Sequence, residues 1–208
     1  MTSITADEIR KSLFGSEHGG NSQQVYTAGF AVPNRILGQS IFDSVAQGKN
    51  VSGFSFGVSQ LDIGTGNLFA ETGYELVLSL SLQEGRIDQA TYERLDLYIG
   101  KNRYDIEGRY PNLTLNGQNI DLSQTWRSDK ALLATLMSYD DAKSIVDLYD
   151  NLYIQADLLP KVQNFLNAMQ NAYGTDSVFD PSNPNYSDAV ATIVDIANRT
   201  DNLEKSEQ

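Results

Sequence analysis

Carboxylates are the side chains of this sequence that are best suited to catalysis. The 208 residues include a single histidine, His18, and no cysteine, so most of the general bases and soft nucleophiles that hydrolases use near neutral pH are missing. A zinc site of several histidines or cysteines cannot form within the chain, and neither can a disulfide. The chemistry that remains is that of paired acids, and we expect no metal and no cofactor.

Glu17 is the carboxylate with the most informative spacing. Residues 6–17 predict a helix in which Ile9, Leu13 and Glu17 follow one another every four residues on one side, and a pair of glycines ends it. Partial burial raises the pKa of a carboxyl group toward about 6–7, so that it can donate a proton to a glycosidic oxygen. The alternative is that Glu17 only pairs with an arginine at the helix end.

Asp62 is the candidate for the second carboxylate that a glycosidase needs, either to activate water or to attack the anomeric carbon. It lies at the end of residues 51–63, which alternate apolar and small side chains and predict a half-buried strand with Ser55 on the cleft side. The alternatives are that Asp62 is a turn residue hydrogen-bonded to the backbone before Gly64, and that Ser55 is part of an ordinary solvent-facing surface.

The elements that position these residues form a small β-rich part followed by a larger helical part, which predicts an α+β fold. Residues 21–53 predict strands and turns, with one short helix around Ile36–Val45. A turn-and-strand excursion is expected at Leu113–Gln118, and residues 200–208 read as a frayed tail. Helical patterns occupy 71–83, 88–98, 128–137, 139–151, 154–172 and 186–199.

Three residues mark the expected helix boundaries. Asp88 and Ser128 are suited to begin helices, because short polar side chains can accept a hydrogen bond from a helix N-terminus. Pro160 either begins a helix or kinks one longer helix.

The charge of the chain argues against two classes of partner. The net charge is -12 and the isoelectric point about 4.4, so phosphate backbones and anionic lipid surfaces should be repelled. No run approaches the ~18 apolar residues that span a bilayer, and the first residues lack the basic and apolar regions of a signal peptide. We therefore expect no nucleic-acid partner, no membrane insertion, and synthesis in the cytoplasm without a signal peptide.

Several segments follow one another in a recognisable order: S-E-x-G-G at 16–20, a Tyr and a Val-Pro within 26–33, S-G-F-S-F-G-V-S-Q-L-D-I-G at 52–64, and L-Q-E-G-R-I-D at 82–88. Together they resemble pesticin and its phage-lysozyme-like relatives, over about residues 10–130. The resemblance implies a lysozyme-like single domain over residues 1–208, mainly helical with a small β-rich lobe. Residues 6–66 would hold the first helix and the β-rich lobe, and residues 71–199 the helical lobe.

The resemblance also implies the catalytic roles. Glu17 would be the proton donor, Asp62 would hold the attacking water, and Ser55 stands where the family has a threonine that helps to place that water. The reaction would be inverting hydrolysis of the β-1,4 bond between N-acetylmuramic acid and N-acetylglucosamine in peptidoglycan. The distance from Ser55 to Asp62 is one residue longer than in the family, so we expect a bulge that keeps Asp62 on the cleft side.

The glycan strand of peptidoglycan is the partner that this reading implies. Gln60, Ser59 and Tyr26 would contact it, Gln60 through an acetamido group, although Gln60 also fits an ordinary polar residue at a strand end. The chain would act on the cell wall after delivery or release, as an antibacterial toxin or a phage lysin, and an injected toxin would need an immunity protein. The alternatives are a noncatalytic glycan- or protein-binding module on the same fold, and a chitosanase-like glycosidase.

Two further features have competing interpretations. Tyr98 and Trp126 could stack on sugar rings or belong to the core. Residues 180–188 carry oxygen ligands at alternate positions, which suits either a calcium loop or a proline-containing loop that closes on its own backbone before the last helix.

Overall fold

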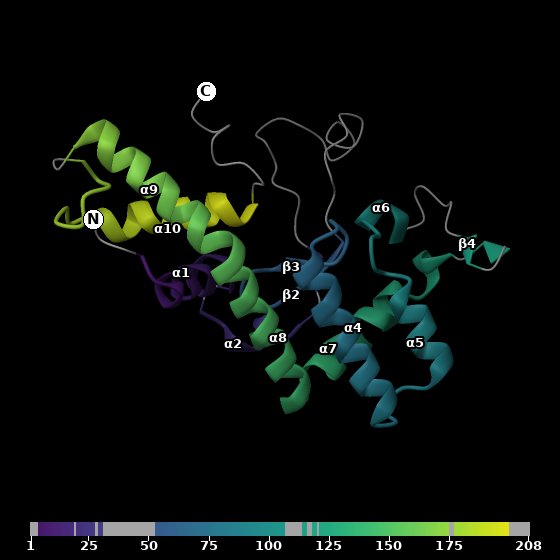
Figure 1. The fold of residues 1–208 in the computed structure, drawn as a ribbon. Helices are drawn as coiled ribbons and strands as arrows, with labels where there is room; N and C mark the ends of the chain where they lie inside the picture. Colours follow the sequence, from purple (N-terminus) through teal and green to yellow (C-terminus); the bar gives the residue numbers. More distant parts are fainter. Residues whose placement is uncertain are drawn as a thin grey trace. The chain divides into compact units, whose positions relative to one another are not determined.

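The computed structural model describes residues 4–18, 20–27, 29–30, 53–106, 114–115, 118–119, 121–174 and 177–199. These residues are mostly helical with two small antiparallel sheets, which confirms the α+β class (Figure 1). The expected helix at Ile36–Val45, the Val-Pro pair at residues 32–33 and the tail at 200–208 lie outside the described residues.

The described residues divide into two compact units. One contains the residues up to Gln24 and those from Asp150 onward, and the other contains Val25–Tyr149. The first unit is built from α1 (Ala6–His18), the π-helical segment η2 (Ile154–Leu158), α9 (Leu159–Tyr173) and α10 (Tyr186–Arg199).

Helix α1 begins where its sequence predicts, ends one residue later, and has the predicted apolar face buried. Ile9 and Leu13 are both fully buried, and α1 packs against α10 and η2. Its start is a capping box, because Glu8 Oε2 accepts the Thr5 N–H at 2.8 Å while Thr5 Oγ1 accepts the Glu8 N–H at 3.3 Å. The hydrogen bonds that the Thr5 hydroxyl, at 2.7 Å, and the Thr5 N–H donate to Glu8 Oε2 hold the pKa of Glu8 below its ordinary value of 4.5.

Pro160 lies in the first turn of α9, as the first of its two expected positions has it, and α9 itself continues a longer helix. Helix α8 (Asp140–Tyr153) continues through η2 into α9 without a break. Proline has no N–H to donate to the carbonyl four residues earlier, and the π-helical turns end two residues before it.

The helical part of the second unit is centred on α4 (Leu68–Gln83), which contacts α5 (Gln89–Asp96), α7 (Trp126–Met137) and β3. Asp88 caps α5 as predicted, since its side chain accepts the Thr91 N–H at 2.8 Å. Ser128 does not begin α7, which starts two residues earlier. The Ser128 hydroxyl instead donates to the Thr125 carbonyl at 2.7 Å.

The strands of the second unit are very short. The strands β1 (Gly29–Phe30), β2 (Phe54–Phe56) and β3 (Leu61–Asp62) form one antiparallel sheet in that order. The strands β4 (Thr114–Leu115) and β5 (Gln118–Asn119) form a separate hairpin where the sequence predicts a turn-and-strand excursion. Short helical turns complete the chain at α2 (Ser22–Val25), α6 (Arg103–Ile106) and η1 (Leu122–Gln124).

The single strand expected over residues 51–63 is replaced by a hairpin. Residues 57–60 form a turn between β2 and β3, in which Gly57 and Gln60 have positive φ angles of 82° and 53°. Such angles reverse the chain direction, so the alternation of side chains in the sequence does not continue as one strand.

Candidate functional site

Ser55 and Asp62 are directly opposite each other across β2 and β3. In an antiparallel pair, residues that face each other in this way project their side chains to the same side of the sheet. The extra residue between them is therefore accommodated by the turn, and the expected bulge does not occur between these described strands. On the other side, Ser55 faces Gly29 of β1, which has no side chain.

The polar residues of this hairpin differ in how far their side chains are buried. Ser55 and Ser59 are only 1% and 3% exposed, whereas Gln60 and Asp62 are half-buried. All three residues of β2 are buried, so Ser55 does not belong to a solvent-facing surface. Gln60 and Asp62 are the polar side chains of the hairpin that reach toward solvent.

The Ser55 hydroxyl is bound to Gln60. Ser55 Oγ donates a hydrogen bond to Gln60 Oε1 at 2.9 Å, across the β2–β3 turn. Gln60 is the one non-glycine residue with a positive φ in the described part of the chain, and its own N–H donates to the Gly57 carbonyl at 3.3 Å.

Asp62 fastens the base of the hairpin. Its Oδ1 accepts the backbone N–H of Gly53 at 2.9 Å and that of Gly64 at 2.7 Å. The bond to Gly64 is the one expected if Asp62 is a turn residue, and the bond to Gly53 also ties Asp62 to the residue before β2. Because an ionised carboxylate accepts such bonds more strongly than a neutral acid, they favour the charged form of Asp62.

The glycines on both sides of this clamp are in close contact. A Cβ added to Gly53 would lie 2.4 Å from the Lys101 carbonyl oxygen, and one added to Gly64 would lie 2.7 Å from it. The two glycines that end the S-G and D-I-G segments therefore have a structural role in this chain. They allow a backbone contact which a larger residue would disrupt.

The same segment also contains a motif that is typical of serine hydrolases. Gly53-Phe54-Ser55-Phe56-Gly57 fits the G-x-S-x-G motif, in which a nucleophilic serine sits on a sharp turn between a strand and a helix. Ser55 lies within a strand, is buried, and donates a hydrogen bond to Gln60. This geometry contradicts a nucleophile elbow.

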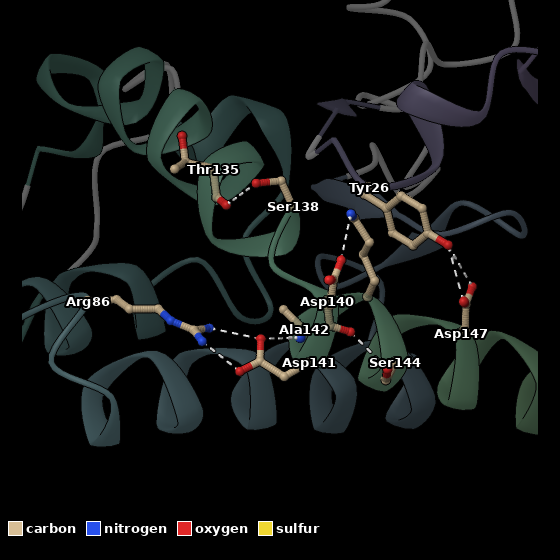
Figure 2. A network of polar contacts seen from close by, with 10 residues as sticks. Tyr26, Arg86, Thr135, Ser138, Asp140, Asp141, Ala142, Ser144 and Asp147 are labelled. Carbon is tan, nitrogen blue, oxygen red and sulfur yellow. Dashed lines mark hydrogen bonds and ion pairs between the residues drawn. The ribbon is translucent and has the colours of Figure 1, made fainter.

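Tyr26 lies next to the hairpin, but its side chain is bound to α8. The Val25 carbonyl accepts the Gly57 N–H at 2.8 Å, which holds the chain against the turn. The Tyr26 hydroxyl donates to the carboxylate of Asp147 at 3.1–3.2 Å (Figure 2). Lys143 Nζ lies 5.7 Å from the centre of the Tyr26 ring. Tyr26 thus has a defined packing role, and its glycan contact stays a prediction.

Glu17 is the next-to-last residue of α1, as its spacing predicts. Its side chain lies outside the described residues. It belongs to the first unit, whereas the hairpin belongs to the second. The structure therefore brings together Ser55, Ser59, Gln60 and Asp62, with Tyr26 beside their turn.

Tyr98 belongs to the core, in a buried polar network that the sequence does not reveal. Tyr98 is fully buried, its hydroxyl donates to Asp129 Oδ2 at 2.8 Å, and its ring centre lies 4.8 Å from that of Phe54. Burial raises the pKa of Tyr98 well above its ordinary value. Asp129 is 1% exposed and also accepts Arg94 Nε at 3.0 Å. The sequence does carry one sign of this network: Asp129 is an acidic residue four positions before Leu133, on the apolar side of a predicted helix.

The loop at residues 180–188 closes on its own backbone. Asp180 Oδ1 accepts the Ser182 N–H at 2.8 Å and the Ser182 hydroxyl at 2.6 Å, which lowers the pKa of Asp180. This favours the loop interpretation over a calcium site. Within the described ranges, no three histidine or acidic side chains gather to hold a metal ion.

Comparisons of the chain with protein-family models, with curated proteins and with solved structures find no match. Among the described helices, none has the combination of length and apolar composition that crossing a membrane requires.

Proposed function

We propose that this chain is a peptidoglycan-cleaving glycoside hydrolase with a lysozyme-like fold. The observation that supports it best is the placement of Ser55 directly opposite Asp62 in a small antiparallel sheet. This sheet follows a helix with Glu17 in its last turn and precedes a helical region, the order that the family resemblance implies.

The proposed reaction uses Glu17 and Asp62 in different protonation states. Glu17 protonates the oxygen of the leaving sugar, and the Asp62 carboxylate takes a proton from the attacking water, which inverts the anomeric centre. A base must be ionised before the reaction, and the two backbone N–H groups bound to Asp62 Oδ1 support that state. The substrate is the β-1,4 bond between N-acetylmuramic acid and N-acetylglucosamine.

A noncatalytic glycan-binding module is the second candidate. It is favoured by the buried Ser55 hydroxyl, which already donates a hydrogen bond to Gln60, and by the two hydrogen bonds that Asp62 accepts from the backbone. Both candidates act at the bacterial cell wall after delivery or release, and a toxin of either kind would be neutralised by a protein made in the producing cell.

The deciding experiment is mass spectrometry of the fragments released from purified sacculi. Hydrolysis at the proposed bond yields fragments with reducing N-acetylmuramic acid ends, while a chitosanase-like activity would require a different polymer. Glu17→Gln should abolish the release and keep the melting temperature. Glu8→Gln is the matched control, because it makes the same change at the other end of α1, where Glu8 only caps the helix.

Three results would count against this assignment. No release by the natural chain contradicts the hydrolase proposal and leaves the binding module. Release that is unchanged in Glu17→Gln contradicts the role of Glu17 as the acid. Reducing N-acetylglucosamine ends would place the cut at the other glycosidic bond.

A further inference from the structure

Gln60 occupies a backbone conformation that glutamine rarely adopts. Its φ of 53° lies in the left-handed region, where glycine or asparagine is favoured because a longer side chain crowds the backbone. Residues held in such conformations cluster at functional sites, where the surrounding structure fixes them for a purpose. The strained backbone therefore indicates a functional role for the Gln60 side chain.

The buried Ser55 hydroxyl fixes one end of the Gln60 amide. Because Ser55 is 1% exposed, water competes little for the hydrogen bond from Ser55 Oγ to Gln60 Oε1. A glutamine side chain otherwise rotates among many conformers, and a fixed acceptor oxygen defines where its amide nitrogen lies. Among the described residues, Ser55 is the hydrogen-bond partner of the Gln60 side chain.

We infer that Ser55 is a positioning residue that holds the half-buried Gln60 amide with its Nε2 ready to donate to the carbonyl oxygen of an N-acetyl group. This inference rests on the proposed glycan substrate. It gives Ser55 a different task from the placement of water that the family resemblance implies.

The neighbouring charge selects a neutral acceptor. The half-buried carboxylate of Asp62 lies across the strand pair from Ser55, and it repels an anionic ligand from this side of the sheet. The net charge of -12 adds to that repulsion. An acetamido carbonyl accepts hydrogen bonds without carrying a charge, and each sugar of the peptidoglycan strand carries an acetamido group.

The test compares two neutral ligands with the same linkage. Binding of the β-1,4-linked tetramer of N-acetylglucosamine and of the β-1,4-linked tetramer of glucose is measured by calorimetry on the full chain. The natural chain should prefer the N-acetylated tetramer. Gln60→Glu keeps the acceptor for Ser55 but has no amide N–H, so it should weaken binding of the N-acetylated tetramer about tenfold and leave the glucose tetramer unchanged.

Ser55 variants then separate positioning from packing. Ser55→Ala should lose about three- to tenfold of the same preference, and Ser55→Thr, which keeps the hydroxyl, should restore it. In a Gln60→Glu background, Ser55→Ala should have little further effect, because both changes remove one coupled interaction. Gln60→Gly should raise the melting temperature by relieving the backbone strain while it loses the preference for the acetamido group.

An NMR measurement makes the test independent of ligand affinity. The Gln60 side-chain NH₂ signals should be well dispersed in the natural chain and in Ser55→Thr, and should move toward random-coil positions in Ser55→Ala. Equal preference for both tetramers in the natural chain, or an unchanged preference in Ser55→Ala and Gln60→Glu, overturns the inference. If the chain cleaves sacculi but does not prefer the N-acetylated tetramer, only the role of Ser55 and Gln60 is contradicted. If it prefers that tetramer but does not cleave sacculi, only the hydrolase proposal is contradicted.

Discussion

Gly53 and Gly64 lie in direct backbone contact at the base of the β2–β3 hairpin. A Cβ on Gly53 would be 2.8 Å from the Gly64 Cα, and one on Gly64 would be 2.6 Å from the Gly53 Cα. Real Cβ atoms do not approach backbone atoms so closely, so neither position can hold a side chain unless the hairpin opens. The contact brings both N–H groups to the same oxygen of Asp62.

Gly53→Ala and Gly64→Ala should each lower the free energy of unfolding by about 2–4 kcal/mol, because the added methyl group displaces backbone rather than a flexible side chain. Urea denaturation measures the loss. Gly15→Ala is the matched control: Gly15 lies within α1 with nothing within 4 Å of its Cβ position, so alanine should stabilise the chain by about 0.5–1 kcal/mol. Equal effects at all three glycines would contradict the backbone contact.

Asp62→Asn and Asp62→Ala separate the clamp from the charge. Asparagine keeps an oxygen acceptor for Gly53 and Gly64, so stability should change little, whereas alanine leaves two backbone N–H groups without that acceptor and should cost about 1–3 kcal/mol. If Asp62 is the base, Asp62→Asn should lose cleavage of sacculi while it keeps its melting temperature. Full activity in a folded Asp62→Asn chain would leave only the structural role.

Tyr98→Phe should destabilise the second unit by about 1.5–3 kcal/mol, because it removes a buried hydrogen bond to a charged acceptor, Asp129. Tyr139→Phe is the control, since Tyr139 is 43% exposed and should stay within about 0.5 kcal/mol of the natural chain. Thermal and urea unfolding report both values. A loss of equal size in Tyr139→Phe would show that the effect is not specific to the buried network.

Acid should weaken the fold through one set of hydrogen-bonded carboxylates. In each of these carboxylates, hydrogen bonds lower the pKa below the ordinary value, which is 4.5 for glutamate and 3.8 for aspartate. The residues concerned are Glu8, Asp88, Asp121, Asp141 and Asp180. A carboxylate with a lowered pKa in the folded state stabilises the fold fully above its unfolded pKa. That stabilisation is lost as the pH falls through the folded value.

Asp88 provides the sharpest test of this pH dependence, because its bonds with Thr91 lower its pKa at the start of α5. The natural chain should be more stable than Asp88→Asn at pH 7, and the difference should shrink as the pH falls below about 4. Denaturant titrations of both chains from pH 7 to pH 2.5 give the difference directly. A difference that grows on acidification would have the wrong sign for this mechanism.

Helix spacing made most of the fold predictable. The stripe of Ile9 and Leu13 predicted α1, and α4, α5, α7, α8 and α10 begin and end within three residues of their predicted bounds. The helix predicted over residues 154–172 corresponds to η2 and α9 together. The β2–β3 hairpin was not predictable, because Phe54, Phe56 and Val58 alternate as they would in one continuous strand and all three are buried. The reversal depends on the backbone angles of Gly57 and Gln60, and a glutamine carries no sequence signal for the left-handed region.

The site was predictable only where it is local. Ser55 and Asp62 are close in sequence, and one tight turn brings them together. The roles of their side chains were not visible, because the Ser55–Gln60 bond and the Asp62 clamp depend on which residues face each other after the chain reverses. Asp129 was missed for a related reason: its partners Arg94 and Tyr98 come from another helix and a turn more than thirty residues away.

The π-helical turns of η2 follow from the spacing of the buried residues along the long helix. Its fully or almost fully buried positions recur every four residues: Ala142, Val146, Asp150, Ile154, Leu158, Val162 and Leu166. In a regular α-helix of 3.6 residues per turn, each step of four residues overshoots a full turn by about 40°, so such a stripe would spiral around the axis. The wider turns of η2 hold more residues per turn than an α-helix, so they wind part of this excess back. Deleting one residue there should convert the π-helical turns into regular α-helix, because a π-helical turn holds more residues than the α-helical turn that would replace it.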